Sequence, residues 1–181
     1  DIIDSHKPLI IFGESFLRSK SAEFLFSSFK NFLLNKNKFS DDWSPFNFLP
    51  SDAATGGNLD LDIIDPSNEL IKKLNENKFD LVFLIGQDNL KFNKKNEFVI
   101  YVGSHGDNGA ELADIILPGA AYTEQSGHYT NLEGRVQKAY KASYPPGDAK
   151  EDWEIINNLA EFMNNRKLFN DKDELESSMF N

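Results

Sequence analysis

Short apolar runs, most of them ending at a glycine, recur along the chain between stretches with helical periodicity. Four have the length of a buried strand, and they lie at residues 7–13 (KPLIIFG), 79–86 (FDLVFLIG), 97–103 (EFVIYVG) and 114–117 (DIIL). Continuous apolar runs of this length are typical of strands in a parallel sheet, which is covered on both faces. The pattern therefore predicts four buried strands.

Apolar residues three and four positions apart predict helices between and after these runs. The first runs from Ala22 to about Asn35, and the second occupies residues 66–78, with Pro66–Ser67 at its start. A wide apolar stripe predicts a third helix in residues 148–163, where Asp148 and Glu151 have the spacing of a capping box.

Two further segments carry weaker helical signals. Ser44 is placed to cap a helix, with Pro45 at its first position and Gly56–Gly57 beyond its end, although Pro50 would shorten or kink it. Residues 104–113 (SHGDNGAELA) read as a loop with one helical turn.

Strands alternating with helices predict an α/β fold with an open, mostly parallel sheet and flanking helices. We assign residues 1–163 to one α/β domain and residues 164–181 to a polar C-terminal tail or weak amphipathic segment. In such sheets ligands bind outside the carboxyl ends of the strands. The loops that follow the strands are therefore where a site is expected.

Composition removes several classes of function. The net charge of −10 and the pI of about 4.7 argue against nucleic-acid partners and against docking on an anionic bilayer. No apolar run approaches the length of a membrane-spanning helix, so we expect no direct membrane insertion. The sequence begins at Asp1, which indicates processing or a piece of a longer protein.

The sequence contains no cysteine at all. Disulfides, thiolate nucleophiles and cysteine-ligated iron–sulfur clusters are therefore excluded within these 181 residues.

The nucleotide and hydrolase motifs are incomplete. FGESFL and IGQDNL each carry one glycine where a dinucleotide fingerprint needs three. Gly13–Ser15 resembles the start of a nucleophile elbow, but Leu17 replaces its second glycine, so a plain strand-to-helix turn is the better interpretation.

The three histidines, His6, His105 and His128, lack the spacing of a zinc site. His105 alone stands in a candidate site loop, where holding the loop by a hydrogen bond is the simpler role.

Residues 113–135 (ADIILPGAAYTEQSGHYTNLEGR) have the glycine-containing, polar composition of a ligand-binding loop. Gly127 and Gly134 permit turns, and Glu124, Glu133 and Arg135 suggest an internal ion pair. From these residue types a cofactor pocket and a rigid scaffold loop both remain open, and the scaffold loop is favoured.

The chain resembles a known family in this region. YVGSHGDNGAELADIILPGAAYTEQSGHYTNLEGRVQ and PPGDAKEDWEIINNLAEF are similar to the C-terminal part of the 75 kDa iron–sulfur subunit of respiratory complex I, NADH:ubiquinone oxidoreductase. The similarity extends back through FDLVFLIGQD and WSPFNFLPSDAATGGNLDLD to PLIIFGES, so it covers most of residues 8–163.

The resemblance implies a molybdopterin-oxidoreductase-like fold that carries no cofactor in this part, with FMN and the iron–sulfur clusters in other parts of the complex. It implies a non-catalytic structural or assembly domain of the peripheral arm. The implied partners are the other peripheral-arm subunits and the N-terminal iron–sulfur part of the same subunit, on the same or a separate chain. The implied location is the matrix side of the mitochondrial inner membrane, or the cytoplasmic face of a bacterial membrane.

On this interpretation the chain contributes no catalytic, cofactor-binding or metal-binding residue. One alternative is an oxidoreductase domain that keeps a molybdopterin or nucleotide near His105, Gly106 and Asp107. The other is a free-standing α/β protein that binds a small molecule.

Overall fold

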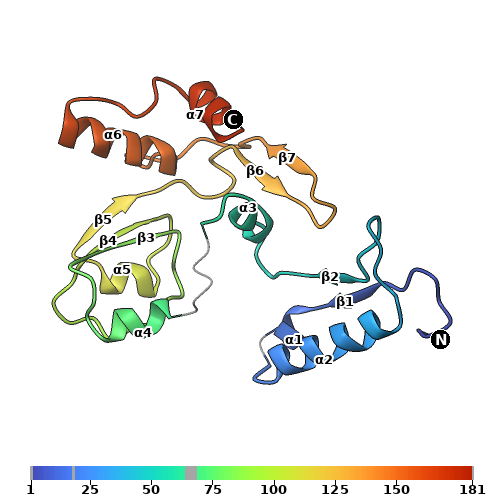
Figure 1. Cartoon of the computed structure of the whole chain (residues 1–181). Coiled ribbons are helices and arrows are strands. Elements are labelled where there is room, and N and C mark those ends of the chain that lie inside the picture. Colours follow the sequence, from blue (N-terminus) through green and yellow to red (C-terminus); the bar gives the residue numbers. More distant parts are fainter. Residues whose placement is uncertain (1, 18, 64–68, 181) are drawn as a thin grey trace. The chain divides into compact units, whose positions relative to one another are not determined.

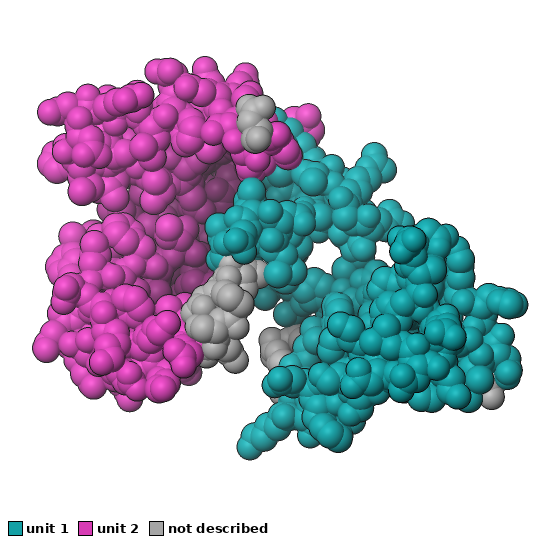
Figure 2. Space-filling model, viewed as in Figure 1, with its two compact units in different colours: residues 1–64, 128–138 teal, residues 65–127, 139–181 magenta. Residues whose placement is uncertain are grey.

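The computed structural model describes residues 2–17, 19–63 and 69–180, and the chain divides into two compact units (Figures 1 and 2). Unit 1 comprises residues 1–64 and 128–138, and unit 2 comprises residues 65–127 and 139–181. The assignment of residues 1–163 to one domain stays a prediction. Parallel strands flanked by helices occur in both units, so the predicted α/β class is confirmed.

In unit 1 a two-stranded parallel sheet packs against a helix through phenylalanine rings. The elements are β1 (Ile10–Phe12), α1 (Glu14–Leu17), α2 (Ala22–Asn35), β2 (Phe46–Phe48) and α3 (Thr55–Asp60). The Phe12 ring lies 6.0 Å from the Phe26 ring of α2 and 5.5 Å from the Phe46 ring of β2, centroid to centroid. Aromatic packing therefore holds strand to strand and sheet to helix.

The helix expected after Ser44 is wrong. Residues 46–48 form β2 instead, in parallel register with β1, and Ile10 N–H donates to the Pro45 carbonyl at 2.7 Å. Phe46 and Phe48 stand two residues apart and both rings pack on Phe12, a strand-like period that outweighs the capping signal. The glycines expected past the end of that helix lie inside α3.

Unit 1 also contains most of the hairpin of β6 (Gly127–Thr130) and β7 (Val136–Ala139). Thr130 Oγ1 donates to the Asp60 carboxylate at 2.7 Å. A Cβ on Gly56 would lie 2.7 Å from the Thr130 carbonyl oxygen, so the glycine allows this close approach of two backbones.

Unit 2 is built on a three-stranded parallel sheet in the order β3-β4-β5 (Figure 1). The strands are β3 (Leu81–Ile85), β4 (Phe98–Gly103) and β5 (Ile115–Pro118), all at predicted positions. α4 (Leu70–Asn75) and the single-turn helix α5 (Asn108–Leu112) flank it. The predicted helix start at Pro66–Ser67 lies outside the described residues.

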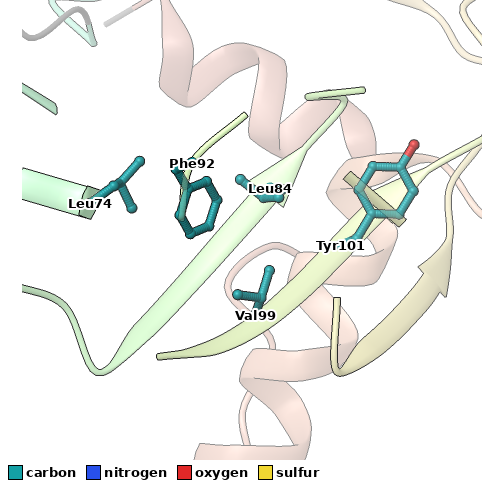
Figure 3. Packing of buried hydrophobic residues seen from close by; sticks show 5 residues of the cluster. All are labelled: Leu74, Leu84, Phe92, Val99 and Tyr101. Carbon is teal, nitrogen blue, oxygen red and sulfur yellow. The ribbon is translucent and has the colours of Figure 1, made fainter. Parts of the chain in front are cut away.

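One face of this sheet carries the core of unit 2. Leu74 of α4, Leu84 of β3, Phe92 of the following loop, and Val99 and Tyr101 of β4 form one buried cluster (Figure 3). Ala110 and Leu112 of α5 pack against it. The short helices thus owe their place to the strand face they cover.

The C-terminal segment, expected as a polar tail or a weak amphipathic segment, contains a helix. After α6 (Asp152–Asn164), the chain turns back and forms α7 (Lys172–Met179). The buried Asn157 side chain accepts from Leu168 N–H at 2.8 Å and Phe169 N–H at 3.1 Å, and donates to the Phe169 carbonyl at 2.8 Å. One amide therefore satisfies three backbone groups of the returning segment.

We predict that Asn157→Ala releases this segment, because the three backbone groups lose their partner at a cost of about 1–3 kcal/mol. Limited proteolysis should then cleave between residues 164 and 171 much faster than in the unmodified protein. The control is Asn158→Ala, since Asn158 is exposed. Equal protection of the Asn157 variant and the control would contradict this anchoring role.

Candidate functional site

The carboxyl ends of the three parallel strands meet at one edge of the unit 2 sheet, where a ligand site is expected. Backbone hydrogen bonds between neighbouring strands continue one residue past the ends of β3 and β5. Gly86 N–H donates to the Val102 carbonyl at 2.8 Å, and Gly119 N–H donates to the Gly103 carbonyl at 3.0 Å. The loops at residues 86–88, 104–107 and 119–121 therefore start from fixed points.

Tyr101 fills the space behind these loops. Its residue surface is 1% exposed, and its hydroxyl donates to the Asp88 carboxylate and lies 2.9 Å from the His105 carbonyl oxygen. In Figure 3 this hydroxyl points away from the apolar cluster. Burial, and then the hydrogen bond to Asp88, raise the pKa of Tyr101 to about 12. The phenol therefore keeps its proton and acts as a fixed donor that links two strand-end loops.

Two glycines make room for the Tyr101 side chain. A Cβ on Gly103 would lie 2.1 Å from the Tyr101 hydroxyl oxygen, and a Cβ on Gly109 would lie 2.7 Å from the ring. The same Cβ on Gly109 would meet the Gln87 carbonyl oxygen at 2.6 Å. Tyr101, the two glycines and the loop after β3 are therefore close-packed, and no added methyl group fits at either glycine.

The residues of the alternative cofactor site lie outside this packed region. His105, Gly106 and Asp107 are all exposed, and the His105 ring is 2.9 Å from the Ser104 hydroxyl through Nδ1. Asp107 is the residue before the first turn of α5, in an extended conformation. They form a surface loop. The buried Tyr101 hydroxyl contacts the backbone carbonyl of His105 in this loop and not the His105 ring.

Metal ligands do not gather anywhere in the described ranges: no group of three or more histidine, aspartate or glutamate side chains is placed to hold an ion there. His6 is exposed and His128 is half-buried in β6. Gly13 stands between β1 and α1, as expected of a strand-to-helix turn.

The ion pair expected within residues 124–135 does not form among the described residues. Glu124 is bound instead within its own turn, where its carboxylate accepts from Ala121 N–H at 2.9 Å. Arg135 is exposed, and its backbone N–H donates to the Asn131 side chain at 2.9 Å to close the turn between β6 and β7. Short-range hydrogen bonds to backbone groups form here in place of an ion pair. They are favoured because they do not require the long arginine side chain to be ordered.

A charge cluster that the sequence did not suggest is centred on Glu151. Its carboxylate is 8% exposed and binds Lys141 at 3.0 Å and also Lys172 of α7. The Lys172 ammonium donates in addition to the Ser126 carbonyl at 2.7 Å. Burial acts to raise the pKa of Glu151, but the hydrogen bonds from Lys172 and Lys141 outweigh it and lower that pKa below the ordinary value.

The predicted capping box is therefore wrong. Glu151 itself is the residue before α6, in an extended conformation, and its side chain makes no capping hydrogen bond. Its two lysine partners are 10 and 21 residues away in sequence, so local spacing could not show them. The cluster joins the residue before α6 to Lys141, to Lys172 of α7 and, through Lys172, to Ser126 after β5.

A family model described as molybdopterin oxidoreductase matches residues 1–162. The chain belongs to the molybdopterin oxidoreductase family.

Curated relatives align with most of the length of this chain. It is 36% identical over 179 residues to the NADH-ubiquinone oxidoreductase 75 kDa subunit of Reclinomonas americana, covering 97% of this chain and 26% of that protein. It is 42% identical over 168 residues to the mitochondrial 78 kDa subunit of Candida albicans, covering 91% and 22%. It is 46% identical over 154 residues to a subunit of the NADH-quinone oxidoreductase of Rickettsia felis, covering 84% and 22%. The chain thus spans about a quarter of the length of these relatives.

The family description raises the question of whether a pterin group fits the strand ends. Such a group is bulky and would need an open crevice beside the loops after β3 and β4. Beneath those loops the buried Tyr101 ring packs against Gly103 and Gly109 so closely that neither glycine has room for a Cβ. The space that the Tyr101 side chain fills is therefore closed to such a group.

We predict that Gly103→Ala destabilises this molybdopterin oxidoreductase domain by about 1–3 kcal/mol, since the new methyl group overlaps the Tyr101 hydroxyl. Gly106→Ala is the matched control, because nothing lies within 4 Å of a Cβ there and its φ is not positive. Denaturant unfolding of both variants measures the difference. A Gly103 variant as stable as the control would mean that Tyr101 moves aside easily.

We predict that Glu151→Gln loses about 2 kcal/mol of stability at pH 7, because two charge-assisted hydrogen bonds weaken. Since the folded-state pKa of Glu151 is lowered, its contribution is complete above the ordinary value of 4.5 and is lost as the pH falls through the folded-state pKa. The stability difference from the unmodified protein should therefore shrink below pH 4.5.

Glu161→Gln serves as the control for this pH series. Glu161 pairs with Lys167 at 3.8 Å with both side chains about half exposed, so its removal should change stability by less than 1 kcal/mol. A difference between Glu151→Gln and the unmodified protein that does not vary with pH would contradict the assigned role of the charge.

Proposed function

We propose that this chain is part of the large iron–sulfur subunit of respiratory complex I and serves there as a structural, non-catalytic domain of the peripheral arm. Support comes from relatives whose alignments cover 84–97% of the chain at 36–46% identity and whose names are those of NADH-ubiquinone or NADH-quinone oxidoreductase subunits. The observation that supports the non-catalytic role is the buried Tyr101 side chain, because its hydroxyl holds the loops at the ends of β3 and β4 to a protein group.

The redox chemistry belongs to other parts of the complex under this proposal. An iron–sulfur cluster needs thiolate ligands, and the sequence of 181 residues has no cysteine. FMN and the clusters are then carried by other subunits and by the iron–sulfur part of the same subunit. This chain contributes loops in fixed positions. Tyr101 and Asp88 hold the loops at the ends of β3 and β4, and the Glu151 cluster holds the segments around α6 and α7.

The partners proposed for the chain are the other peripheral-arm subunits and the N-terminal iron–sulfur part of its own subunit. The proposed location is the matrix side of the mitochondrial inner membrane, with the cytoplasmic face of a bacterial membrane as the equivalent in a bacterium. No helix in the described ranges is both long and apolar enough to cross a membrane. Attachment would therefore run through protein partners.

Native electrophoresis of gently solubilised membranes, with detection of this chain and an NADH-dehydrogenase activity stain, tests the proposal. We expect the chain in the same high-mass band as the activity, and loss of that band when the chain is depleted. A polypeptide that carries this sequence and migrates alone, apart from the high-mass band, would contradict membership of the complex.

The non-catalytic role has its own test. Metal and pterin analysis of the purified complex should find neither molybdenum nor pterin in proportion to this chain. A stoichiometric amount of either would favour the alternative of a cofactor held near His105, Gly106 and Asp107.

A further inference from the structure

The open end of the β6–β7 hairpin is held in unit 2 by a short set of polar contacts. Lys141, which follows β7, donates its N–H to the hydroxyl of Ser126, which precedes β6, at 3.1 Å. Nearby, Ala142 N–H donates to the Thr123 carbonyl at 2.8 Å. The hairpin base is the name that we give to these two segments of unit 2, residues 123–127 and 139–143.

Two lysines and one carboxylate close the hairpin base. The Glu151 carboxylate accepts from Lys141 through Oε1 at 3.0 Å and from Lys172 of α7 through Oε2. The Lys172 ammonium also donates to the Ser126 carbonyl at 2.7 Å, so α7 lies against the base (Figure 1). Lys172 therefore binds the segment that enters β6, Lys141 belongs to the segment that leaves β7, and both lysines meet at Glu151.

The helix that supplies Lys172 has little apolar material with which to hold itself in place. Two of the eight residues of α7, Leu175 and Met179, are apolar. The contacts at its start are polar, since Asn157 binds the backbone of residues 168 and 169 and the Asp171 side chain caps the helix. A short helix of this kind depends on tertiary contacts and opens locally at a low free energy. We therefore expect α7 to detach more readily than the sheet of unit 2 unfolds.

We propose that α7 is a detachable latch on the hairpin base. While Lys172 is bound the base is closed, and when α7 leaves, the base loosens although the sheet of unit 2 stays folded. Departure of Lys172 deprives the Ser126 carbonyl and one oxygen of the Glu151 carboxylate of their donor. This inference concerns the chain alone and does not rest on its membership of complex I.

Burial distinguishes this contact from an ordinary ion pair at the surface. The Glu151 side chain is 8% exposed and the Lys172 side chain 25% exposed, so water replaces a lost partner poorly. The pair of Glu161 and Lys167 lies at 3.8 Å with both side chains about half exposed, and pairs of that kind contribute little. Loss of Lys172 should therefore be felt at the base, whereas loss of Lys167 should not.

The latch acts on two passages of the chain at once. Residues 128–138 of the hairpin belong to unit 1, so the chain leaves unit 2 after Gly127 and returns to it at Ala139. Within unit 1 the hairpin has an attachment of its own, because Thr130 Oγ1 donates to the Asp60 carboxylate at 2.7 Å. The state of α7 thus determines how firmly unit 2 holds its end of the hairpin.

Hydrogen exchange measured by mass spectrometry on the full-length protein tests the latch. Lys172→Met removes the charge and the donor but keeps a side chain of similar length. We expect the backbone amides of residues 139–143 to exchange at least about tenfold faster than in the unmodified protein, because both hydrogen bonds of Lys172 are lost. The amides of β4 should keep their rates, since the core cluster that holds this strand is made by other residues. Lys167→Met is the matched control and should change neither segment.

A second variant tests the coupling between α7 and the base without touching Lys172. Asn157→Ala removes the anchor of residues 168 and 169, which lead into α7. If α7 is a latch, its release should also accelerate exchange in residues 139–143. Asn158→Ala is the control for this variant, since Asn158 is exposed.

Three results would overturn the latch. The first is unchanged exchange in residues 139–143 of the Lys172 variant. The second is faster exchange in α7 of the Asn157 variant with no change at the hairpin base. The third is equal acceleration of β4 and the base in the Lys172 variant, because Lys172 would then stabilise the whole unit. If the Lys172 variant does not fold, the Asn157 variant decides.

Discussion

A single buried hydroxyl, that of Tyr101, fixes the part of this protein in which a functional site would be sought. A phenol group removed from water must have a hydrogen-bond partner, and the Asp88 carboxylate and the His105 carbonyl provide it. Because Asp88 follows β3 and His105 follows β4, the hydroxyl of Tyr101 joins the loops after both strands to β4, the strand that carries it. Gly103 and Gly109 are needed because any larger residue would collide with the ring. The loops thus have the composition of a ligand site but are built around a protein side chain.

The second constraint is that the polar anchors of unit 2 act over long sequence distances. Asn157 binds residues 168 and 169, and Glu151 binds Lys141 and Lys172. These contacts tie α6 and α7 to the segment that follows β5, so the region after the sheet is held by charges and amides more than by an apolar core. Exposed apolar residues occur both in this region, where Phe162 is 87% exposed, and on the sheet, where Leu81 is 50% exposed. A unit that exposes apolar residues in both places is suited to being one part of a larger structure.

The strands of unit 2 and the long helix α2 could be predicted because their signals are local. Residues 79–86 and 97–103 are continuous apolar runs that end at glycine, and α2 repeats its apolar face over fourteen residues. β2 could not be predicted in the same way, because its pairing depends on β1, more than thirty residues earlier. There a proline and a potential cap outweighed the alternation of Phe46 and Phe48. The returning α7 was indicated only as a weak amphipathic segment, since its anchors lie in α6 and at Glu151.

The strand-end loops lie where the sequence predicted them, but Tyr101, the residue that organises them, was not recognised. Tyr101 reads as one more apolar position in a buried strand, and only its place two residues before Gly103 hinted that the phenol would reach the following loop. Glu151 was assigned to a helix cap, because a carboxylate near a helix start has a local explanation that hides distant lysines. Charge partners of this kind are brought together by the tertiary fold, so no regular spacing in the sequence predicts them.

The most direct test is an experimental density map of the assembled complex around Tyr101. The account predicts the tyrosine ring beneath Gly103 and Gly109, its hydroxyl within hydrogen-bond distance of Asp88, and no ligand density between the loops after β3 and β4. A tyrosine side chain turned out of this position, with a bound group in the space it leaves, would contradict the account.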